Sequence, residues 1–143
     1  MKHTWIGLGL LSVALSGCGY PVRREKLVDK FVLFAADDPQ DLSICREIGS
    51  GSCVGGIEGT IAAVGMNKHY ISALQHPHNN PAILNYWYID LTVADSEFKG
   101  VTGPLTKEAF ETATQTSDIP LLTMPIDKTY CLQRKYRLSN YLF

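Results

Sequence analysis

Two strand-like stretches separated by a two-residue turn constrain the fold of this chain most strongly. Ile57–Met66 (IEGTIAAVGM) and His69–Gln75 (HYISALQ) flank Asn67-Lys68. Asn adopts the left-handed backbone conformation of tight hairpin turns more readily than most residues do. In the second stretch, Tyr70, Ser72 and Leu74 alternate with Ile71, Ala73 and Gln75, which is the two-residue period of a β-strand. The pattern therefore predicts an antiparallel hairpin.

A third stretch, Leu84–Val93 (LNYWYIDLTV), predicts the next strand. One of its faces carries Trp87, Ile89, Leu91 and Val93, and the other carries Tyr86, Tyr88, Asp90 and Thr92. Because the first set is purely apolar, it is predicted to face the core. Tyr86 and Tyr88 would then share a face with Tyr70 of the hairpin. These tyrosines are a candidate binding surface if that face is open, and core residues if a helix covers it.

The remaining elements are shorter. Strands are predicted at Lys30–Ala36, more weakly at Asp41–Ile48, and near Leu121–Met124, while the glycine-rich stretch Gly49–Gly59 reads as a loop or a bulged strand entry. A helix is predicted from Lys107 to about Gln115, with Thr106 as N-cap and Phe110 as its apolar anchor. The expected fold class is α+β, an antiparallel sheet of four to six strands around the central hairpin with one packed helix. Residues 30–143 would form one globular domain, in which the tail Lys128–Phe143 is ambiguous between helix and strand.

The N-terminus carries the longest apolar run, Trp5–Ala14, which is ten residues long and follows Lys2 and His3. A membrane-spanning helix needs about 20 apolar residues, so this run is too short to span and a polytopic membrane protein is excluded. Its length fits the hydrophobic region of a secretory signal peptide. The run is followed by Leu15-Ser16-Gly17-Cys18, which resembles the lipobox of bacterial lipoproteins.

The lipobox resemblance implies a covalent lipid and a location. It implies that the signal peptide 1–17 is removed and that Cys18 receives diacylglycerol and a further acyl chain such as palmitate. Residues 19–29 are polar, with Pro21 and a cluster of charges, so residues 18–29 are predicted to form a lipid-anchored tether. The protein would then be a membrane-anchored lipoprotein of the cell envelope, facing the periplasm or the cell exterior. Gly19 stands where Asp commonly signals inner-membrane retention, so the resemblance implies the outer membrane in a Gram-negative host. No cofactor other than this lipid is expected.

Three further segments, IAAVGMNKHYISALQHP, YWYIDL and GPLTKEAF, resemble a family of small uncharacterised bacterial lipoproteins. The resemblance covers about 60 residues and departs from the family pattern between Cys45 and Cys53 and beyond Pro120. It implies an α+β fold and a lipid anchor. It transfers no catalytic residue.

The cysteines suit an oxidising compartment. With Cys18 assigned to lipid, Cys45, Cys53 and Cys131 remain, and disulfides persist in extracytoplasmic compartments. Cys45 and Cys53 flank a Gly/Ser-rich turn and are the favoured disulfide candidate, with the Cys45–Cys131 and Cys53–Cys131 pairs left open. One thiol remains in any pairing, either as a buried cysteine or as a mixed-disulfide site.

Few residues carry a chemical signature. Thirteen Lys and Arg face fourteen Asp and Glu, a balance that argues against a nucleic-acid partner. His76 and His78 flank Pro77 in a loop and are weak candidates for metal ligands, with exposed turn histidines as the plainer interpretation. The acidic turn Asp37–Asp41 lacks the glycine and distal Glu of an EF-hand loop. No catalytic residue or metal site is therefore assigned.

These observations predict a non-enzymatic interaction module anchored in the cell envelope, which contacts an envelope protein or a cell-wall partner. One alternative is a periplasmic immunity or inhibitor protein that blocks a toxin or a lytic enzyme. The other alternative is a small metal-dependent envelope enzyme that uses the His76–His78 loop. The sequence leaves the partner and the oligomeric state open.

Overall fold

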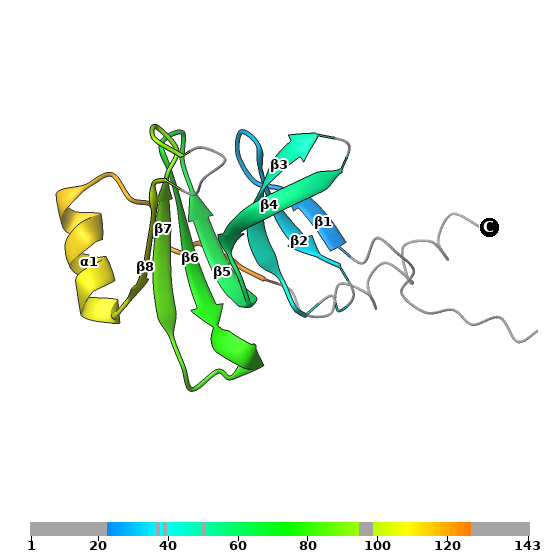
Figure 1. The fold of residues 1–143 in the computed structure, drawn as a ribbon. Coiled ribbons are helices and arrows are strands. Elements are labelled where there is room, and N and C mark those ends of the chain that lie inside the picture. Colours follow the sequence, from blue (N-terminus) through cyan, green and yellow to red (C-terminus); the bar gives the residue numbers. More distant parts are fainter. Residues whose placement is uncertain (1–22, 37, 39, 50, 95–98, 127–143) are drawn as a thin grey trace, which may run out of the picture.

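The computed structural model describes residues 23–36, 38, 40–49, 51–94 and 99–126. These residues form nine β-strands in two antiparallel sheets, together with one α-helix and a short 3₁₀ turn (Figure 1). The antiparallel β architecture with a single helix agrees with the α+β prediction. The prediction of one sheet with four to six strands is wrong, because the strands divide into a four-stranded and a five-stranded sheet.

The four-stranded sheet has the order β1-β2-β3-β4, so each strand pairs with its neighbour in the chain. Its strands are β1 (Arg23–Lys26), β2 (Phe31–Ala35), β3 (Ser43–Gly49) and β4 (Ser52–Ile57). Strand β1 lies within the stretch 18–29 that the polar composition predicted to be a tether, so that prediction is wrong for Arg23–Lys26, which belong to the sheet. Strand β4 occupies most of the glycine-rich stretch, with register shifts against β3 that correspond to the bulged alternative.

The five-stranded sheet has the order β8-β7-β6-β5-β9. Its strands are β5 (Thr60–Met66), β6 (Tyr70–His76), β7 (Asn85–Asp90), β8 (Val101–Leu105) and β9 (Met124–Pro125), and the 3₁₀ turn η1 (Pro77–Asn79) follows β6. The predicted hairpin is β5–β6. Strand β8, which contains Gly103-Pro104, was not among the strands that the sequence predicted. Proline is tolerated there because β8 is an edge strand.

The hairpin turn uses Asn67 in a different way from the one predicted. Asn67 does not adopt a positive φ. Instead, its Oδ1 accepts hydrogen bonds from the backbone N–H groups of His69 and Tyr70, both at 2.8 Å, and its own N–H donates to the Tyr70 carbonyl at 2.9 Å. Asn therefore closes the turn as a side-chain acceptor, which is the Asx-turn role of this residue.

Both sheets contribute to one hydrophobic core. The first sheet supplies Phe31, Leu33, Ala35, Ile44 and Ile57, the β2–β3 connection supplies Leu42, and the second sheet supplies Ile61, Val64, Ile71, Ala73 and Ile89. The Ile61 N–H donates to the Leu42 carbonyl at 2.9 Å, which joins the sheets next to this core. As predicted, Trp87, Ile89 and Leu91 lie on the core side, but Val93 is 54% exposed because β7 ends at Asp90.

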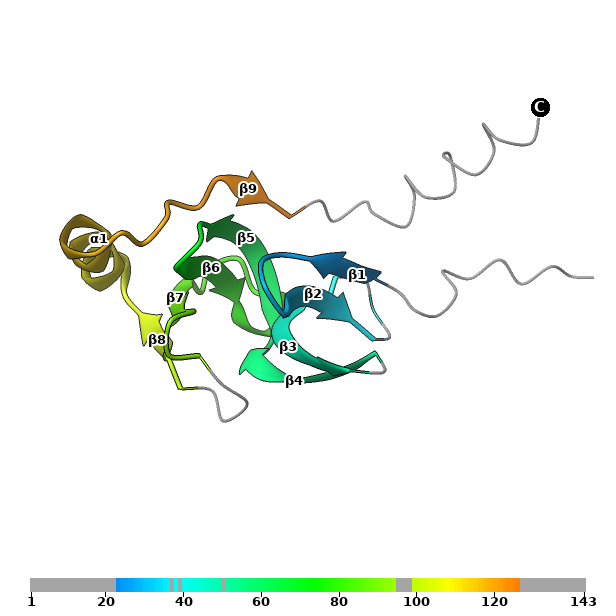
Figure 2. The same ribbon diagram turned by 90° about the horizontal axis from the view of Figure 1, so that it is seen from above.

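Helix α1 (Lys107–Thr116) lies beside β7 and β8, at the end of the molecule away from the first sheet (Figures 1 and 2). The predicted N-cap is confirmed, since Thr106 Oγ1 accepts from the Ala109 N–H at 3.2 Å. The predicted anchor is confirmed as well, since Phe110 is buried. Across the described residues, no helix has the length and apolar content needed to cross a membrane.

The segment after the helix runs back over strand β5. Asn67 Nδ2 donates to the Asp118 carbonyl at 2.7 Å, and the Thr123 N–H donates to the Val64 carbonyl at 3.2 Å. Ile119 is buried, and β9 then pairs with β5. We call residues 117–123 the strap, because they tie α1 and β9 to the hairpin.

Candidate functional site

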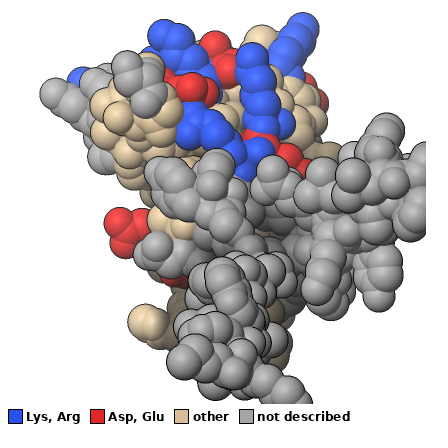
Figure 3. Space-filling model, turned by 90° about the vertical axis from the view of Figure 1, so that its right-hand side faces the viewer, with Lys and Arg blue, Asp and Glu red and all other residues tan. Residues whose placement is uncertain are grey.

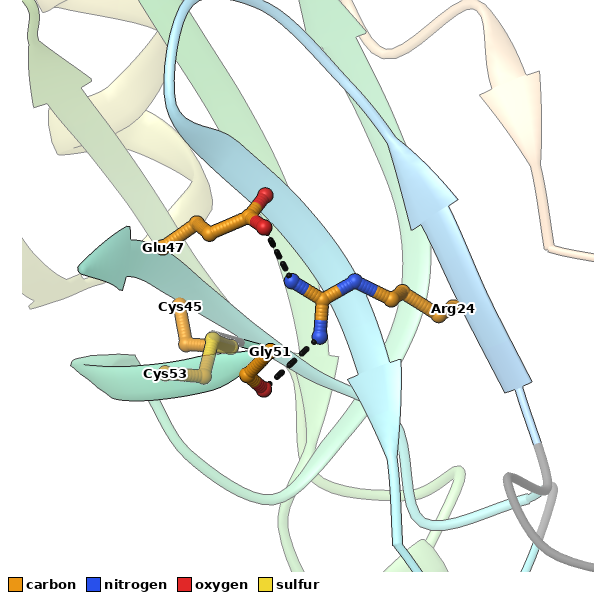
Figure 4. The surroundings of a disulfide bond; sticks show 5 residues. All are labelled: Arg24, Cys45, Glu47, Gly51 and Cys53. Carbon is orange, nitrogen blue, oxygen red and sulfur yellow. Dashed lines mark hydrogen bonds and ion pairs between the residues drawn. A yellow bond between two sulfur atoms is a disulfide. The ribbon is translucent and has the colours of Figure 1, made fainter. Parts of the chain in front are cut away.

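The Cys45–Cys53 disulfide is present, so the favoured pairing is confirmed. Cys45 in β3 and Cys53 in β4 have Cα atoms 5.7 Å apart, within the normal range for a disulfide. Arg24 lies beside the bond: its Nη2 forms an ion pair with Glu47 Oε1 at 2.8 Å, and its Nη1 donates to the Gly51 carbonyl at 3.0 Å (Figure 4). These contacts fasten β1 to the disulfide-linked β3–β4 hairpin. Cys18 and Cys131 lie outside the described residues.

The three candidate tyrosines fall on one face of the second sheet, as their spacing predicted. The pairs Ser72–Tyr88 and Leu74–Tyr86 in the β6–β7 register place them there. Tyr86 stacks on Phe110 of α1 with ring centroids 5.2 Å apart, while Tyr70 and Tyr88 meet edge to face at 6.3 Å. All three are partly buried. Helix α1 thus covers the Tyr86 end of this face.

The two candidate metal ligands, His76 and His78, have different surroundings. His76 ends β6, and its Nδ1 lies 3.1 Å from the Ile83 carbonyl oxygen, so it helps to hold the following loop. His78 is exposed in η1 and has a positive φ of 53°, followed by Asn79 with a φ of 56°. Two consecutive non-glycine residues in the left-handed region are unusual. They direct this loop toward the β2–β3 connection.

His78 lines an open groove together with the acidic turn that the sequence analysis treated separately. The groove has a volume of about 620 Å³, and its titratable lining residues are Asp38, Asp41, Glu58 and His78. We call it the acidic groove. No group of three or more His, Cys, Asp or Glu residues in the described part of the chain is placed to hold a metal ion. The acidic groove therefore offers hydrogen-bond acceptors and negative charge, and it does not assemble a metal centre from these residues.

Gln75 fixes one wall of the acidic groove. It is buried, and its Oε1 accepts hydrogen bonds from Trp87 Nε1 at 2.9 Å and Asn85 Nδ2 at 3.2 Å. Its Nε2 donates to the carbonyl of Glu58 in the β4–β5 turn. A buried amide with its partners in place links the two sheets at this point. The sequence pattern placed Gln75 on the same face of its strand as Ile71 and Ala73 but did not reveal this role.

A second groove lies at the opposite end of the four-stranded sheet. It has a volume of about 570 Å³ and is lined by Lys26, Asp29, Lys30, Arg46, Glu47, Ile48 and Gly49. We call it the basic groove. In an antiparallel meander the β1–β2 and β3–β4 turns lie at one end and the β2–β3 turn at the other, so the two grooves face opposite ways. The sequence analysis did not single out its residues. The surplus of basic residues in 23–30 is the sequence feature that could have indicated this groove.

Among the ionisable groups of the described residues, Glu108 has a clearly shifted pKa. The pKa of Glu108 in the first turn of α1 is lowered, first by the hydrogen bond that its carboxylate accepts from its own backbone N–H and then by the Thr106 hydroxyl. Such carboxylates complement the free N–H groups of a helix N-terminus. Because Glu108 is fully exposed, this contact belongs to helix capping and not to a reactive site.

No family model, curated protein or solved structure matches this chain. The functional argument therefore rests on the residues and on the geometry described above.

Proposed function

We propose that this protein is a lipid-anchored lipoprotein of the bacterial cell envelope, attached through Cys18, and that its folded domain is a non-enzymatic interaction module. The observation that carries the proposal is the Cys45–Cys53 disulfide. Disulfides persist in the envelope and are rare in the cytosol. The disulfide thus agrees with the export signal that the LSGC sequence at residues 15–18 resembles.

The anchor would consist of acyl chains on Cys18 in a mature chain that begins at that residue. One acyl chain gives reversible membrane binding, and two or more give stable attachment. In a Gram-negative host, Gly19 after the cysteine favours transport to the outer membrane. The similarity to small uncharacterised bacterial lipoproteins supports the same location.

The interaction role is supported by the surfaces that the domain presents. The acidic groove and the Tyr70–Tyr88 pair lie on elements held by the core and by the β5–β6 hairpin, so they are pre-organised for a partner. We expect an envelope protein or a cell-wall component as that partner. A toxin or a lytic enzyme as partner would identify the protein as an inhibitor.

Metabolic labelling with palmitate tests the anchor. The full chain is expected to incorporate label, and Cys18→Ser is expected to abolish it. Cys131→Ser is the matched control, because it removes a different cysteine and should leave the label unchanged. Equal label in the parent chain and in Cys18→Ser would refute the anchor.

Affinity capture from detergent-solubilised envelope tests the interaction role, with the lipidated chain as bait. A saturable, stoichiometric partner supports the module. Metal bound at stoichiometric level, together with an activity lost in His78→Ala, would overturn it in favour of the metal-dependent enzyme. Failure to capture any partner above background would also count against it.

A further inference from the structure

Strand β1 determines at which end of the four-stranded sheet the proposed anchor joins the domain. Arg23 pairs with Ala35, the last residue of β2, so the chain from Cys18 enters the sheet at the end where β2 continues into β3. Asp38 and Asp41 of that connection line the acidic groove. Four residues separate Cys18 from Arg23, and an extended chain covers at most about 18 Å over this interval. While β1 is paired, a lipid on Cys18 therefore holds the acidic groove close to the bilayer.

Strand β1 (Arg23–Lys26) lacks the apolar burial that holds the other strands of its sheet. Its sequence RREK contains no apolar residue, and Glu25 and Lys26 are exposed. Figure 3 faces the side on which β1 lies and shows Lys and Arg, with some Asp and Glu among them, on the surface at the top of that side. Backbone hydrogen bonds to β2 replace bonds to water and contribute little net free energy, and ordering the strand costs conformational entropy. Edge pairing by itself therefore holds β1 weakly.

Arg24 ties β1 to a part of the chain that the disulfide closes. Its Nη2 lies 2.8 Å from Glu47 Oε1 and its Nη1 donates to the Gly51 carbonyl at 3.0 Å, so the side chain reaches across β2 to the β3–β4 hairpin (Figure 4). We call these two contacts the Arg24 clasp. Glu47 and Gly51 both lie inside the ring that the Cys45–Cys53 bond closes. The disulfide thus fixes the two acceptors of Arg24 relative to each other.

The residues that follow β1 are held by the core. Leu27 and Val28 pack against it, the Leu27 N–H donates to the Phe31 carbonyl at 3.0 Å, and the Phe31 N–H donates to the Val28 carbonyl at 2.9 Å. They form the β1–β2 turn beside the basic groove, at the end of the sheet opposite the acidic groove. Detachment of β1 therefore moves the point of attachment to the other end of the sheet, and the connection to Cys18 lengthens from four residues to eight.

We propose that the Cys45–Cys53 disulfide is a redox switch that controls access to the acidic groove through β1. In the oxidised protein the Arg24 clasp keeps β1 paired, and the acidic groove faces the bilayer. In the reduced protein β1 detaches, the anchor joins the domain at the β1–β2 turn, and the acidic groove faces away from the bilayer toward partners. This inference rests on the proposed lipid anchor and interaction role, and it names how the partner site is regulated.

The redox step is a two-electron exchange with a dithiol reductant. Cys53 is partly exposed on the edge strand β4, whereas Cys45 is 6% exposed, so attack occurs at Cys53 Sγ. A thiolate of the dithiol forms a mixed disulfide with Cys53 and displaces the Cys45 thiolate. The second thiol of the reductant then attacks the mixed disulfide and releases Cys53. The reductant ends as a disulfide, its two protons pass to the protein thiols, and the turn that carries Glu47 and Gly51 loses its covalent closure.

Amide hydrogen exchange tests the switch without the lipid. The mature chain carrying Cys18→Ser keeps every described element, because the first of them begins at Arg23. After reduction with dithiothreitol, the amides of β1 should exchange at least about tenfold faster than in the oxidised protein, because hydrogen bonds to charged groups are worth that factor or more. They should also exchange before the amides of the inner strand β3. Unchanged exchange in β1, or exchange of β1 and β3 together, would overturn the inference.

Glu47→Gln tests the Arg24 clasp with the disulfide intact. The variant removes the ion pair with Arg24 and should speed exchange in β1 about threefold, as expected for a partly exposed ion pair. Glu111→Gln is the matched control, because it removes the ion pair with Lys107 at 3.6 Å and leaves β1 untouched. Equal exchange of the β1 amides in the two variants would contradict the role of the Arg24 clasp.

Energy transfer from Trp87 tests the change of orientation on a membrane. Trp87 is the only tryptophan of residues 18–143, and its Nε1 donates to Gln75 at the wall of the acidic groove. On vesicles that contain dansyl-labelled phosphatidylethanolamine, transfer from Trp87 in the lipidated protein should fall on reduction, since the attachment point moves by the length of β1, about 13 Å. Cys45→Ser with Cys53→Ser should show the lower transfer without reductant. Undiminished transfer would refute the reorientation, whereas missing palmitate on the full chain would refute the anchor itself.

Discussion

Gly65 provides a sharp test of how the strap covers the hairpin. A β-carbon added to Gly65 would lie 2.1 Å from the carbonyl oxygen of Leu121 and 2.6 Å from Ser72 Oγ, so the strap would have to move. Gly65 does not need a positive φ. At such a strand position, Gly→Ala normally stabilises a protein by about 0.4–1 kcal/mol. The structure predicts the opposite sign for Gly65→Ala.

The size of the effect follows from what the strap contributes. Displacing it exposes Ile119, whose burial is worth about 1.5–3 kcal/mol. It also breaks the bonds from the Thr123 N–H to the Val64 carbonyl and from Asn67 Nδ2 to the Asp118 carbonyl, worth about 1 kcal/mol each. Together these losses amount to about 3.5–5 kcal/mol, and the gain of about 0.4–1 kcal/mol that Gly→Ala normally brings offsets part of them. Gly65→Ala should therefore lower the free energy of unfolding by about 3–4 kcal/mol.

Urea denaturation of the mature chain with Cys18→Ser measures this difference. Amide hydrogen exchange locates it, because the Thr123 N–H should lose protection before the core strands do. Gly51→Ala is a useful contrast: Gly51 has open space around it but a φ of +78°, so we expect a loss of only about 1 kcal/mol from backbone strain. A Gly65→Ala protein at least as stable as its parent would refute the described position of Leu121.

Three further perturbations test other parts of the fold. Replacing Cys45 and Cys53 together by Ser should lower the free energy of unfolding by roughly 2.6 kcal/mol, as estimated from a closed ring of about nine residues and measured in urea. Ser72→Ala should raise the melting temperature, because the Ser72 hydroxyl is buried without a hydrogen-bond partner in the described part of the chain. Thr106→Ala should cost about 1 kcal/mol of helix capping and raise the pKa of Glu108 toward its usual value, as followed by NMR titration.

The pH dependence of the last variant has a defined sign. The lowered pKa of Glu108 means that its contribution is present above the pKa of the unfolded chain and is lost as the pH falls through the lower folded value. The acid side of the stability profile should therefore be slightly flatter in Thr106→Ala than in the parent. An unchanged Glu108 titration in that variant would contradict the hydrogen bond from Thr106.

Local patterns in the sequence predicted most of the elements. Alternation identified the two hairpin strands and the Tyr86–Tyr88 strand, since a half-buried strand needs one apolar face and the two-residue period shows it. Thr106 and Phe110 located the helix, because capping and helical spacing both depend on residues only a few positions apart in the chain. The Cys45–Cys53 pairing also followed from proximity along the chain.

Features that depend on distant contacts were decided only by the tertiary structure. Strand β1 (RREK) has no apolar pattern, and it is a strand because it adds to the edge of β2. The division into two sheets depends on how Ile44 and Ile61 share one core. The acidic groove also depends on distant contacts, since Asp41 and His78 line it together although they are far apart in sequence.

The sequence by itself therefore determined the period of the hairpin strands and of β7, the N-cap and anchor of the helix, and the Cys45–Cys53 pairing, which are all properties of short segments. Tertiary structure decided which strands became edges, which face the strap covers, and where the charges gather. The physical reason is that burial and charge clustering depend on the summed environment of residues from several elements. A local pattern records only the preference of its own segment.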